Sequence, residues 1–166
     1  MKKILWILIA AVVIFILGIT YYFINSPFTI NSVKVPDSVD TYTKANVENM
    51  DGYLVTGTTN SFIKNCKYVT YNPESSLNHV YICKPNNNPE DSISSWINKE
   101  MNFLNQGNQK FTIGETEIND INVKTLTIGD ENCGNPGYCT TYYWKQGKVI
   151  FSSNTERLVQ FYISVN

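Results

Sequence analysis

The most apolar part of the chain lies at its start. Residues 4–24 read ILWILIAAVVIFILGITYYFI and contain no charged side chain, while Lys2 and Lys3 precede them. At 1.5 Å per residue, a helix of this length spans about 30 Å, the thickness of the hydrocarbon core of a bilayer. The pattern therefore predicts a transmembrane anchor. A cleaved secretory signal is the alternative, but its apolar core is usually only about 7–15 residues long.

The residues that flank this apolar run predict its orientation. Lysines favour the cytoplasmic side of a membrane, and the aromatic residues at 21–23 suit the opposite interface. We therefore expect a cytoplasmic stub at 1–3, a transmembrane anchor at 4–24, a tether at 25–29 and an extracytoplasmic domain at 30–166. Later apolar runs are too short to cross again, so the sequence predicts a single-pass protein of the cell membrane.

Beyond the tether, short segments alternate between apolar and polar positions, as half-buried strands do. Strands are expected at 30–35 and 51–57, with a polar stretch between them. The end of the chain, 157–165, places every second residue from Val159 to Val165 on one apolar side. This segment is therefore also predicted to be a strand.

Two later segments carry turn residues between alternating runs and predict β-hairpins. Segment 110–129 turns at Asn119 and Asp120, which both tolerate positive φ, and segment 140–152 turns at Gln146 and Gly147. Both are expected to add antiparallel strands to one sheet.

Segment 66–83, CKYVTYNPESSLNHVYIC, begins and ends with cysteine and has turn residues in its middle. In a hairpin, positions whose numbers sum to 149 would face each other. This register pairs aromatic and β-branched residues as cross-strand neighbours should pair. The predicted pairs are Cys66 with Cys83, Tyr68 with Tyr81, Val69 with Val80, and Thr70 with His79.

One segment has the signals of a helix at both ends. Asn88 is a suitable N-cap, Pro89 fits the first helical position, and Glu90 and Asp91 suit the positive end of the helix dipole. Gly107 is expected to end the helix. The apolar residues recur at helical spacing and predict one buried face: Ile93, Trp96, Ile97, Met101 and Leu104.

These elements predict an α+β fold, in which an N-terminal transmembrane helix precedes a largely antiparallel β-sheet with one long helix packed on a face. Over 79–153, the order HVYICKPNNNPEDSISSWINKEMNFLNQ, KFTIGETEINDINVKTLTIG and YYWKQGKVIFS resembles small α+β domains of the PsbP/Mog1 type. Those families are mostly non-catalytic accessory or binding proteins. The resemblance implies a binding role and assigns no functional residue.

The charge of the chain excludes some classes of partner. Without Lys2 and Lys3, the sequence has 11 basic and 14 acidic residues, a net charge of −3, and no block of like charge. Nucleic-acid binding and polybasic lipid binding both need clustered Lys or Arg. We expect no nucleic-acid partner.

Four cysteines allow three pairings, of which we favour Cys66 with Cys83 and Cys133 with Cys139. The first pair would clip the hairpin, and the second would enclose the turn sequence GNPGY. Disulfides belong to an oxidising compartment, which agrees with the predicted topology. Four reduced, buried thiols are one alternative. A zinc site is another, although the sequence lacks C-x-x-C.

The candidates for chemistry are few. His79 lacks a second histidine for a metal site and is expected to be a strand residue. Ser61 and Lys64 match the bare S-x-x-K pattern of serine acyl enzymes, without its companion motifs. Asp130, Glu131 and Asn132 offer oxygen ligands for calcium but lack the D-x-D-x-D-G order. We expect an ordinary turn there, and we predict no catalytic residue, metal or cofactor.

Tyr142, Tyr143 and Trp144 could form a recognition surface, since aromatic residues carry interface energy, but most are expected in the core. The sequence predicts a membrane-anchored, extracytoplasmic, non-catalytic binding or accessory module of the cell envelope. Its partner would be another envelope protein or a polymer. The alternative is an envelope hydrolase or transferase with an unrecognised acidic or serine site.

Overall fold

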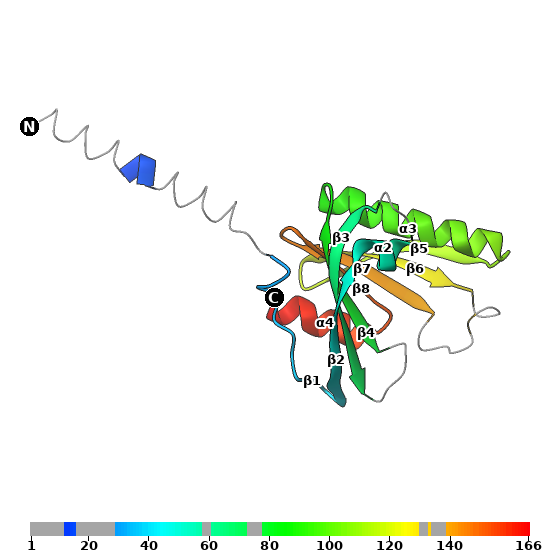
Figure 1. Cartoon of the computed structure of the whole chain (residues 1–166), viewed down its shortest axis with the longest axis horizontal. Coiled ribbons are helices and arrows are strands. Elements are labelled where there is room, and N and C mark those ends of the chain that lie inside the picture. Colours follow the sequence, from blue (N-terminus) through cyan, green and yellow to red (C-terminus); the bar gives the residue numbers. More distant parts are fainter. Residues whose placement is uncertain (1–11, 16–28, 58–60, 73–77, 130–132, 134–138) are drawn as a thin grey trace, which may run out of the picture.

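A computed structural model describes residues 12–15, 29–57, 61–72, 78–129, 133 and 139–166. The described residues form one antiparallel sheet of eight strands in the order β1-β2-β3-β4-β8-β7-β6-β5 (Figure 1). The strands are β1 (Ser38–Val39), β2 (Tyr42–Asp51), β3 (Ile63–Asn72), β4 (His79–Pro85), β5 (Phe111–Ile118), β6 (Ile121–Ile128), β7 (Thr140–Gln146) and β8 (Val149–Ser153). The helices are α2 (Gly52–Thr56), α3 (Pro89–Gln106) and α4 (Glu156–Val165).

The predicted fold class needs correction. A single eight-stranded sheet dominates the described residues, and α3 is joined by a second packed helix, α4, on the opposite face. In the described ranges, no helix is long and apolar enough to cross a membrane, so the predicted transmembrane helix at 4–24 is not supported. Apart from residues 12–15, that range lies outside the described residues.

The strand predicted at 157–165 is wrong, because this segment belongs to helix α4. The prediction counted every second residue. The buried residues instead recur at helical spacing, at Leu158, Val159, Tyr162 and Ile163. That spacing makes one continuous apolar face, which α4 packs against the sheet.

The two strands predicted at 30–35 and 51–57 are also wrong. The polar stretch between them forms β2, whose side chains are mostly exposed on both faces and so show no alternation. Residues Gly52–Thr56 form helix α2 instead. A Cβ atom on Gly52 would lie 1.9 Å from the carbonyl oxygen of Ile63, so only glycine allows α2 to approach β3 this closely.

The hairpins and the long helix are confirmed. Strands β3 and β4 pair in the predicted register, including Cys66 with Cys83 and Thr70 with His79, although the predicted turn falls partly on residues outside the described part. The β5–β6 and β7–β8 hairpins also form. Helix α3 begins after Asn88, whose side chain accepts a hydrogen bond from the Glu90 N–H, and its C-cap is Gly107.

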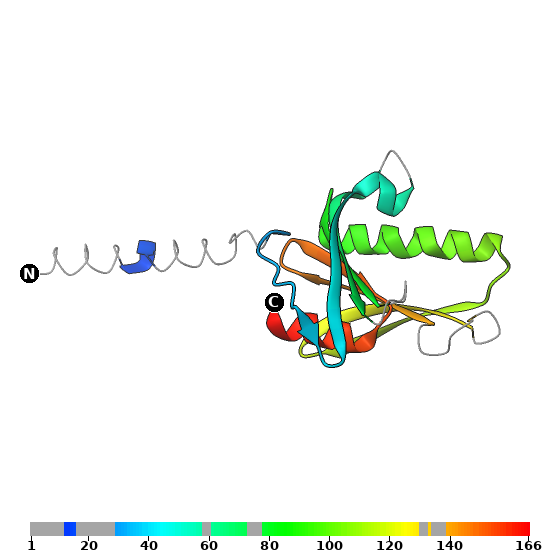
Figure 2. The same ribbon diagram turned by 60° about the horizontal axis from the view of Figure 1, so that its bottom comes forward.

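The sheet is covered on both faces, and each face has its own core. Figure 2 shows α3 (green) and α4 (red) on opposite sides of the strands. On the α3 side, Trp96 and Ile97 pack with Tyr143 and Ile150. On the α4 side, Leu158 packs with Trp144, Val80 and other residues of the sheet. Every residue of β8 is buried, because this central strand faces both cores.

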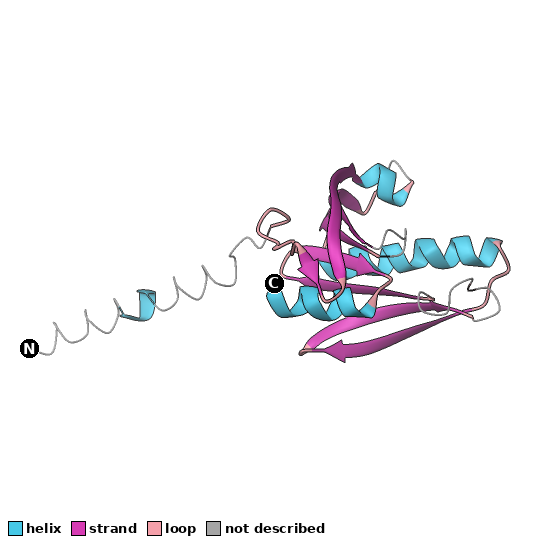
Figure 3. Ribbon diagram, turned by 90° about the horizontal axis from the view of Figure 1, so that it is seen from below, coloured by secondary structure: helices cyan, strands magenta, loops and turns pink. Residues whose placement is uncertain are grey.

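The sheet is strongly twisted, so the strands at its two ends run in different directions (Figure 3).

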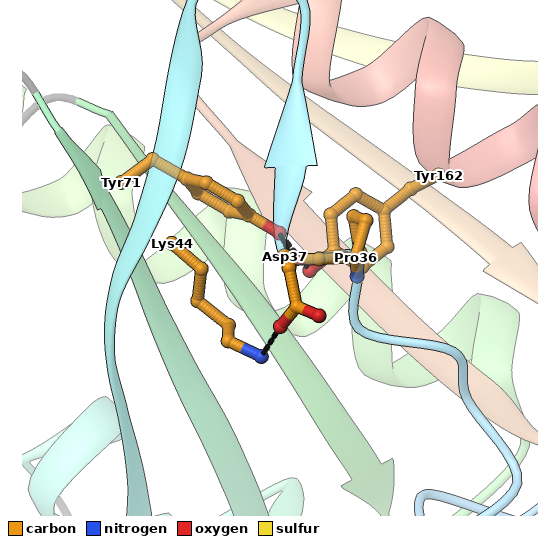
Figure 4. A network of polar contacts seen from close by, with 5 residues as sticks. All are labelled: Pro36, Asp37, Lys44, Tyr71 and Tyr162. Atoms are coloured by element: carbon orange, nitrogen blue, oxygen red, sulfur yellow. Dashed lines mark hydrogen bonds and ion pairs between the residues drawn. The ribbon is translucent and has the colours of Figure 1, made fainter.

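Near the β1 end, two buried tyrosines connect the segment before β1 to α4 (Figure 4). The hydroxyl groups of Tyr71 and Tyr162 lie 2.8 Å apart, and Tyr71 donates to the Pro36 carbonyl oxygen at 3.3 Å. Burial raises the pKa of Tyr71 to about 12. Asp37 beside them pairs with Lys44.

Candidate binding surface

The long free edge of the sheet is β5. Strand β5 ends the strand order and pairs only with β6 among the described elements. Its eight residues pair with β6 without a register shift, and the six residues between Phe111 and Ile118 are all exposed. An exposed edge of this kind offers unpaired backbone groups to another strand.

The hydrogen-bond phase of β5 identifies which backbone groups are free. The Gly129 N–H donates to the Lys110 carbonyl oxygen at 2.8 Å, so this pair is hydrogen-bonded. Hydrogen-bonded and non-hydrogen-bonded pairs alternate along an antiparallel ladder. The even-numbered residues of β5 therefore direct their N–H and C=O toward β6. The residues that direct them outward are Phe111, Ile113, Glu115 and Glu117.

The side chains of these same four residues lie on the α3 side of the sheet. Glu115 pairs with Lys124, which pairs with Tyr143 of the α3-side core, and directly paired residues project to one face. Phe111 is half-buried, whereas Ile113 is 50% exposed and both glutamates are exposed. Along this face, the edge changes from apolar to acidic.

The opposite edge of the sheet is less suited to pairing. Strand β1 covers the beginning of β2 at Tyr42 and Thr43. The register of β2 against β3 then shifts between Lys44 and Asn46, which marks a β-bulge or irregularity. Short cover strands, bulges and lysines are the features that keep sheet edges from pairing. Of the two edges, β5 is the regular one.

A polar groove lies beside the free edge, between the β5–β6 hairpin and α4. Its volume is about 580 Å³. Glu156 is held within it, because Tyr142 donates to one carboxylate oxygen at 3.4 Å and Gln160 donates to the other at 3.0 Å. Burial and the nearby Glu156 raise the pKa of Tyr142. The lining residues are Thr116, Glu117, Ile118, Asn119, Thr125, Thr140, Tyr142, Glu156 and Gln160.

No protein-family profile, curated protein or solved structure matches this chain.

An aromatic cluster on the α3 side encloses a partly buried carboxyl group. The Trp96 ring lies 5.9 Å from that of Tyr81 and 5.8 Å from that of Tyr143. Tyr143 donates a hydrogen bond of 2.5 Å to Glu100. Burial raises the pKa of Glu100. These rings form the core beneath α3, so their first role is to hold the helix on the sheet.

The predicted cysteine pairs lie at disulfide-bonding distance. Cys66 and Cys83 are joined across β3 and β4, and Cys133 is joined to Cys139 ahead of β7.

His79 lies on β4 as predicted, and the centre of its ring is 5.3 Å from that of Tyr68 and 5.1 Å from that of Tyr81. The described residues include no group of three or more His, Cys, Asp or Glu side chains that could hold a metal.

The S-x-x-K residues do not share a helical turn. Ser61 precedes β3, and its hydroxyl group donates to the Gly52 carbonyl oxygen at 3.2 Å and accepts from the Ile63 N–H at 3.0 Å. Lys64 lies within β3, on an exposed position. The acidic loop at 130–132 lies outside the described residues.

The three neighbouring aromatics separate onto the two faces. Tyr143 is buried on the α3 side. Trp144 is buried on the α4 side, where its ring stacks on Phe151 at 5.0 Å. Tyr142 is half-buried and lines the groove.

Sequence reasoning did not identify the free edge. The signal was present in KFTIGETEI, because threonines fall on one face of the expected strand and glutamates on the other, so that both faces carry polar residues. Such a strand cannot lie in the middle of a sheet that is covered on both sides. It is expected at an edge.

Proposed function

We propose that this domain is a non-catalytic binding module that docks an extended segment of another protein on β5 by strand addition. The observation that supports it is the long, regular edge of β5. Backbone groups of four residues point outward there without an irregularity in the register. Main-chain hydrogen bonds to such an edge supply affinity, and alternate side chains supply specificity.

The scaffold behind the edge favours binding, because it holds β5 in one conformation. The β5–β6 turn places Asn119 and Asp120 at φ of 48° and 63°, which suits the right-handed twist of a two-residue hairpin. Val123 of β6 is fully buried in the α4-side core and fixes the hairpin to the body of the domain. A partner strand would then bear most of the ordering cost of binding.

The two cysteine pairs at bonding distance support a location in an oxidising, extracytoplasmic compartment. A partner in the same compartment, such as another envelope protein, fits this location. The predicted localisation and the predicted envelope partner stay predictions.

The test is to block the edge without disturbing its pairing to β6. Proline at position 113 removes an N–H that points outward, and edge strands tolerate proline at such positions. Ile113→Val keeps the N–H and serves as the matched control. Random decapeptides displayed on phage would be selected on the full chain, and the enriched peptides would then be measured against both variants.

We expect the enriched peptides to bind the wild type and Ile113→Val alike and to lose at least tenfold in affinity for Ile113→Pro. Melting curves of the variants check that both still fold. The proposal is wrong if no peptide is enriched, or if the enriched peptides bind the proline variant as tightly as the wild type.

A further inference from the structure

We infer that the strand recognised by β5 is basic at two alternate positions and apolar at the next alternate position. This inference rests on the proposed function and specifies its partner. In the N-to-C direction of an antiparallel partner, the pattern is basic-x-basic-x-apolar. The two basic residues would lie opposite Glu117 and Glu115, and the apolar residue would lie opposite Ile113.

An added strand would bring its side chains next to those of Glu115 and Glu117. Glu115 and Glu117 direct their backbone groups outward, toward an added strand, while their side chains lie on the α3 side of the sheet. Residues directly opposite each other in an antiparallel pair project to the same face, with Cβ atoms about 4.5–5.5 Å apart. Each partner residue that bonds to the backbone of these glutamates therefore also lies beside a carboxylate.

The two glutamates give the edge an uncompensated negative charge. In the described part of the chain, neither Glu115 nor Glu117 forms an ion pair. The cross-strand neighbour of Glu115 is Lys124, but its ammonium group lies 3.8 Å from Glu90 and 3.4 Å from the Ser94 hydroxyl group on α3. The lysine is thus directed toward the helix, and the edge keeps two carboxylates that a cationic strand would neutralise.

A second copy of β5 is not the preferred occupant of the edge. Two copies of β5 related by a two-fold axis normal to the sheet would pair antiparallel. Because the outward-directed backbone groups belong to odd-numbered residues, each odd-numbered residue would lie opposite an odd-numbered residue of the other copy. Registers centred on residues 114–116, which overlap most of β5, place Glu115 opposite Glu115 or Glu117 of the other copy, or set both glutamates opposite Ile113 and Phe111. The first arrangement opposes like charges, which is destabilising. The second covers the carboxylates with apolar side chains without a partner.

The direction of the partner follows from the rest of the sheet. All seven neighbouring strand pairs among the described elements are antiparallel. Antiparallel pairing is also slightly more stable per residue than parallel pairing. From its N-terminus to its C-terminus, an antiparallel partner runs from the acidic end of β5 to the apolar end. Its residues therefore follow the order basic-x-basic-x-apolar.

The test uses three fluorescein-labelled peptides and the full chain, with binding measured by fluorescence anisotropy. The lysine peptide is Gly-Thr-Lys-Thr-Lys-Thr-Ile-Thr-Gly. The glutamate peptide replaces both lysines by glutamate. The register peptide has the composition of the lysine peptide but places its two lysines side by side, so that they project to opposite faces of the added strand.

We expect the lysine peptide to bind about tenfold more tightly than the glutamate peptide and severalfold more tightly than the register peptide. The preference for lysine over glutamate should invert in the double variant Glu115→Lys/Glu117→Lys and weaken as salt is added. Both substituted positions are exposed, so the variant should melt as the wild type does.

Equal affinities for the lysine and glutamate peptides, or a preference that does not invert, would overturn the inference. If that happens while Ile113→Pro still abolishes binding, strand addition stands and only the charge pattern is wrong. If the lysine peptide binds Ile113→Pro as tightly as the wild type, both proposals are wrong. Failure of all three peptides, when library peptides do bind at β5, overturns the charge pattern alone.

Discussion

Among the described residues, Glu100 is the carboxyl group whose pKa is raised by burial. It lies on α3 against the aromatic cluster, where burial raises its pKa and the Tyr143 hydroxyl group donates to it. Burial, together with the charge of Glu100, also raises the pKa of Tyr143. The folded protein therefore holds a proton on Glu100 more tightly than the unfolded chain does.

This difference predicts a pH dependence of stability. Because the pKa of Glu100 is raised above its ordinary value of 4.5, its contribution to stability is fully present below pH 4.5. The contribution is lost as the pH rises through the raised pKa. Glu100→Gln keeps an acceptor for Tyr143 without the charge. We expect this variant to melt at a higher temperature than the wild type at pH 8 and to lose that advantage at pH 4.

Melting curves at the two pH values measure the effect, and Glu117→Gln on the exposed edge controls for the loss of one negative charge. A Glu100→Gln variant that is less stable than the wild type at pH 8 would contradict the prediction. The same holds if its advantage does not shrink at pH 4.

At the scale of residues, local spacing predicts some positions well and others only in hindsight. The symmetry of 66–83 is enough to place Cys66 opposite Cys83, because a hairpin register needs only the two strands. Glu100 was missed, although it lies four residues after Trp96 and so on the same side of the helix. Its surroundings depend on Tyr143, which donates to it, and on Tyr81, with which it interacts electrostatically, and both tyrosines come from other elements.

At the scale of elements, the two disulfides differ in their access to solvent. Cys66 is 1% exposed and Cys83 is fully buried between the sheet and α3. Cys139 is 8% exposed, and Cys133 is more accessible than its partner. A thiolate must reach a sulfur atom to reduce the bond, so access controls the rate.

We therefore expect limited reduction of the folded protein to open Cys133–Cys139 before Cys66–Cys83. Alkylation of the released thiols and peptide mapping over time would show the order. In denaturant, where access is equal, the difference should largely disappear. Earlier release of Cys66 and Cys83 in the folded protein would contradict this prediction.

Replacing both Cys66 and Cys83 by alanine should lower the free energy of unfolding by about 3 kcal/mol.

The elements that the sequence predicts correctly are those with short-range signals. The β5–β6 hairpin has two turn residues that accept positive φ, and α3 has an N-cap, a proline and a terminal glycine. Strand β2 lacks such signals, and α4 has only a threonine at its N-cap and a glutamate in its first turn. The first is exposed on both faces because it lies near a sheet edge, and the second fits both a strand and a helix until its packing face is known.

At the scale of the whole molecule, the two cores share the strands that separate them. Neighbouring residues of β4, Ile82 and Cys83, belong to opposite cores, and so do Ile150 and Phe151 of β8. A loss of packing on one face therefore weakens the strands that support the other. The arrangement predicts one cooperative unfolding transition for both faces.

Two tryptophans report on the two cores separately, since Trp96 lies on the α3 side and Trp144 on the α4 side. With Trp6 and one of these replaced by phenylalanine, the remaining tryptophan follows one core. Added Ile97→Ala or Leu158→Ala should each lower the free energy of unfolding by about 2–5 kcal/mol. Within each variant, both reporters should give the same midpoint in urea, and two separate midpoints would contradict the prediction.

The order of the strands could not be predicted from the sequence. The neighbours β4 and β8 are about seventy residues apart, and no local pattern indicates that they pair. The identity of the free edge depends on this order, because β5 is an edge only once every other strand has found its place. The binding surface is thus a property of the assembled sheet.

The side chain of Asn166, after α4, is hydrogen-bonded to the backbone of Lys34, before β1. It accepts a hydrogen bond from the Lys34 N–H at 2.6 Å and donates one to the Lys34 carbonyl oxygen at 3.3 Å. Lys34, which precedes β1, and Asn166, which follows α4, therefore lie next to each other, while β5 lies at the far end of the strand order. The domain could be inserted as a cassette into a loop of a carrier protein, or circularly permuted, with its free edge still open.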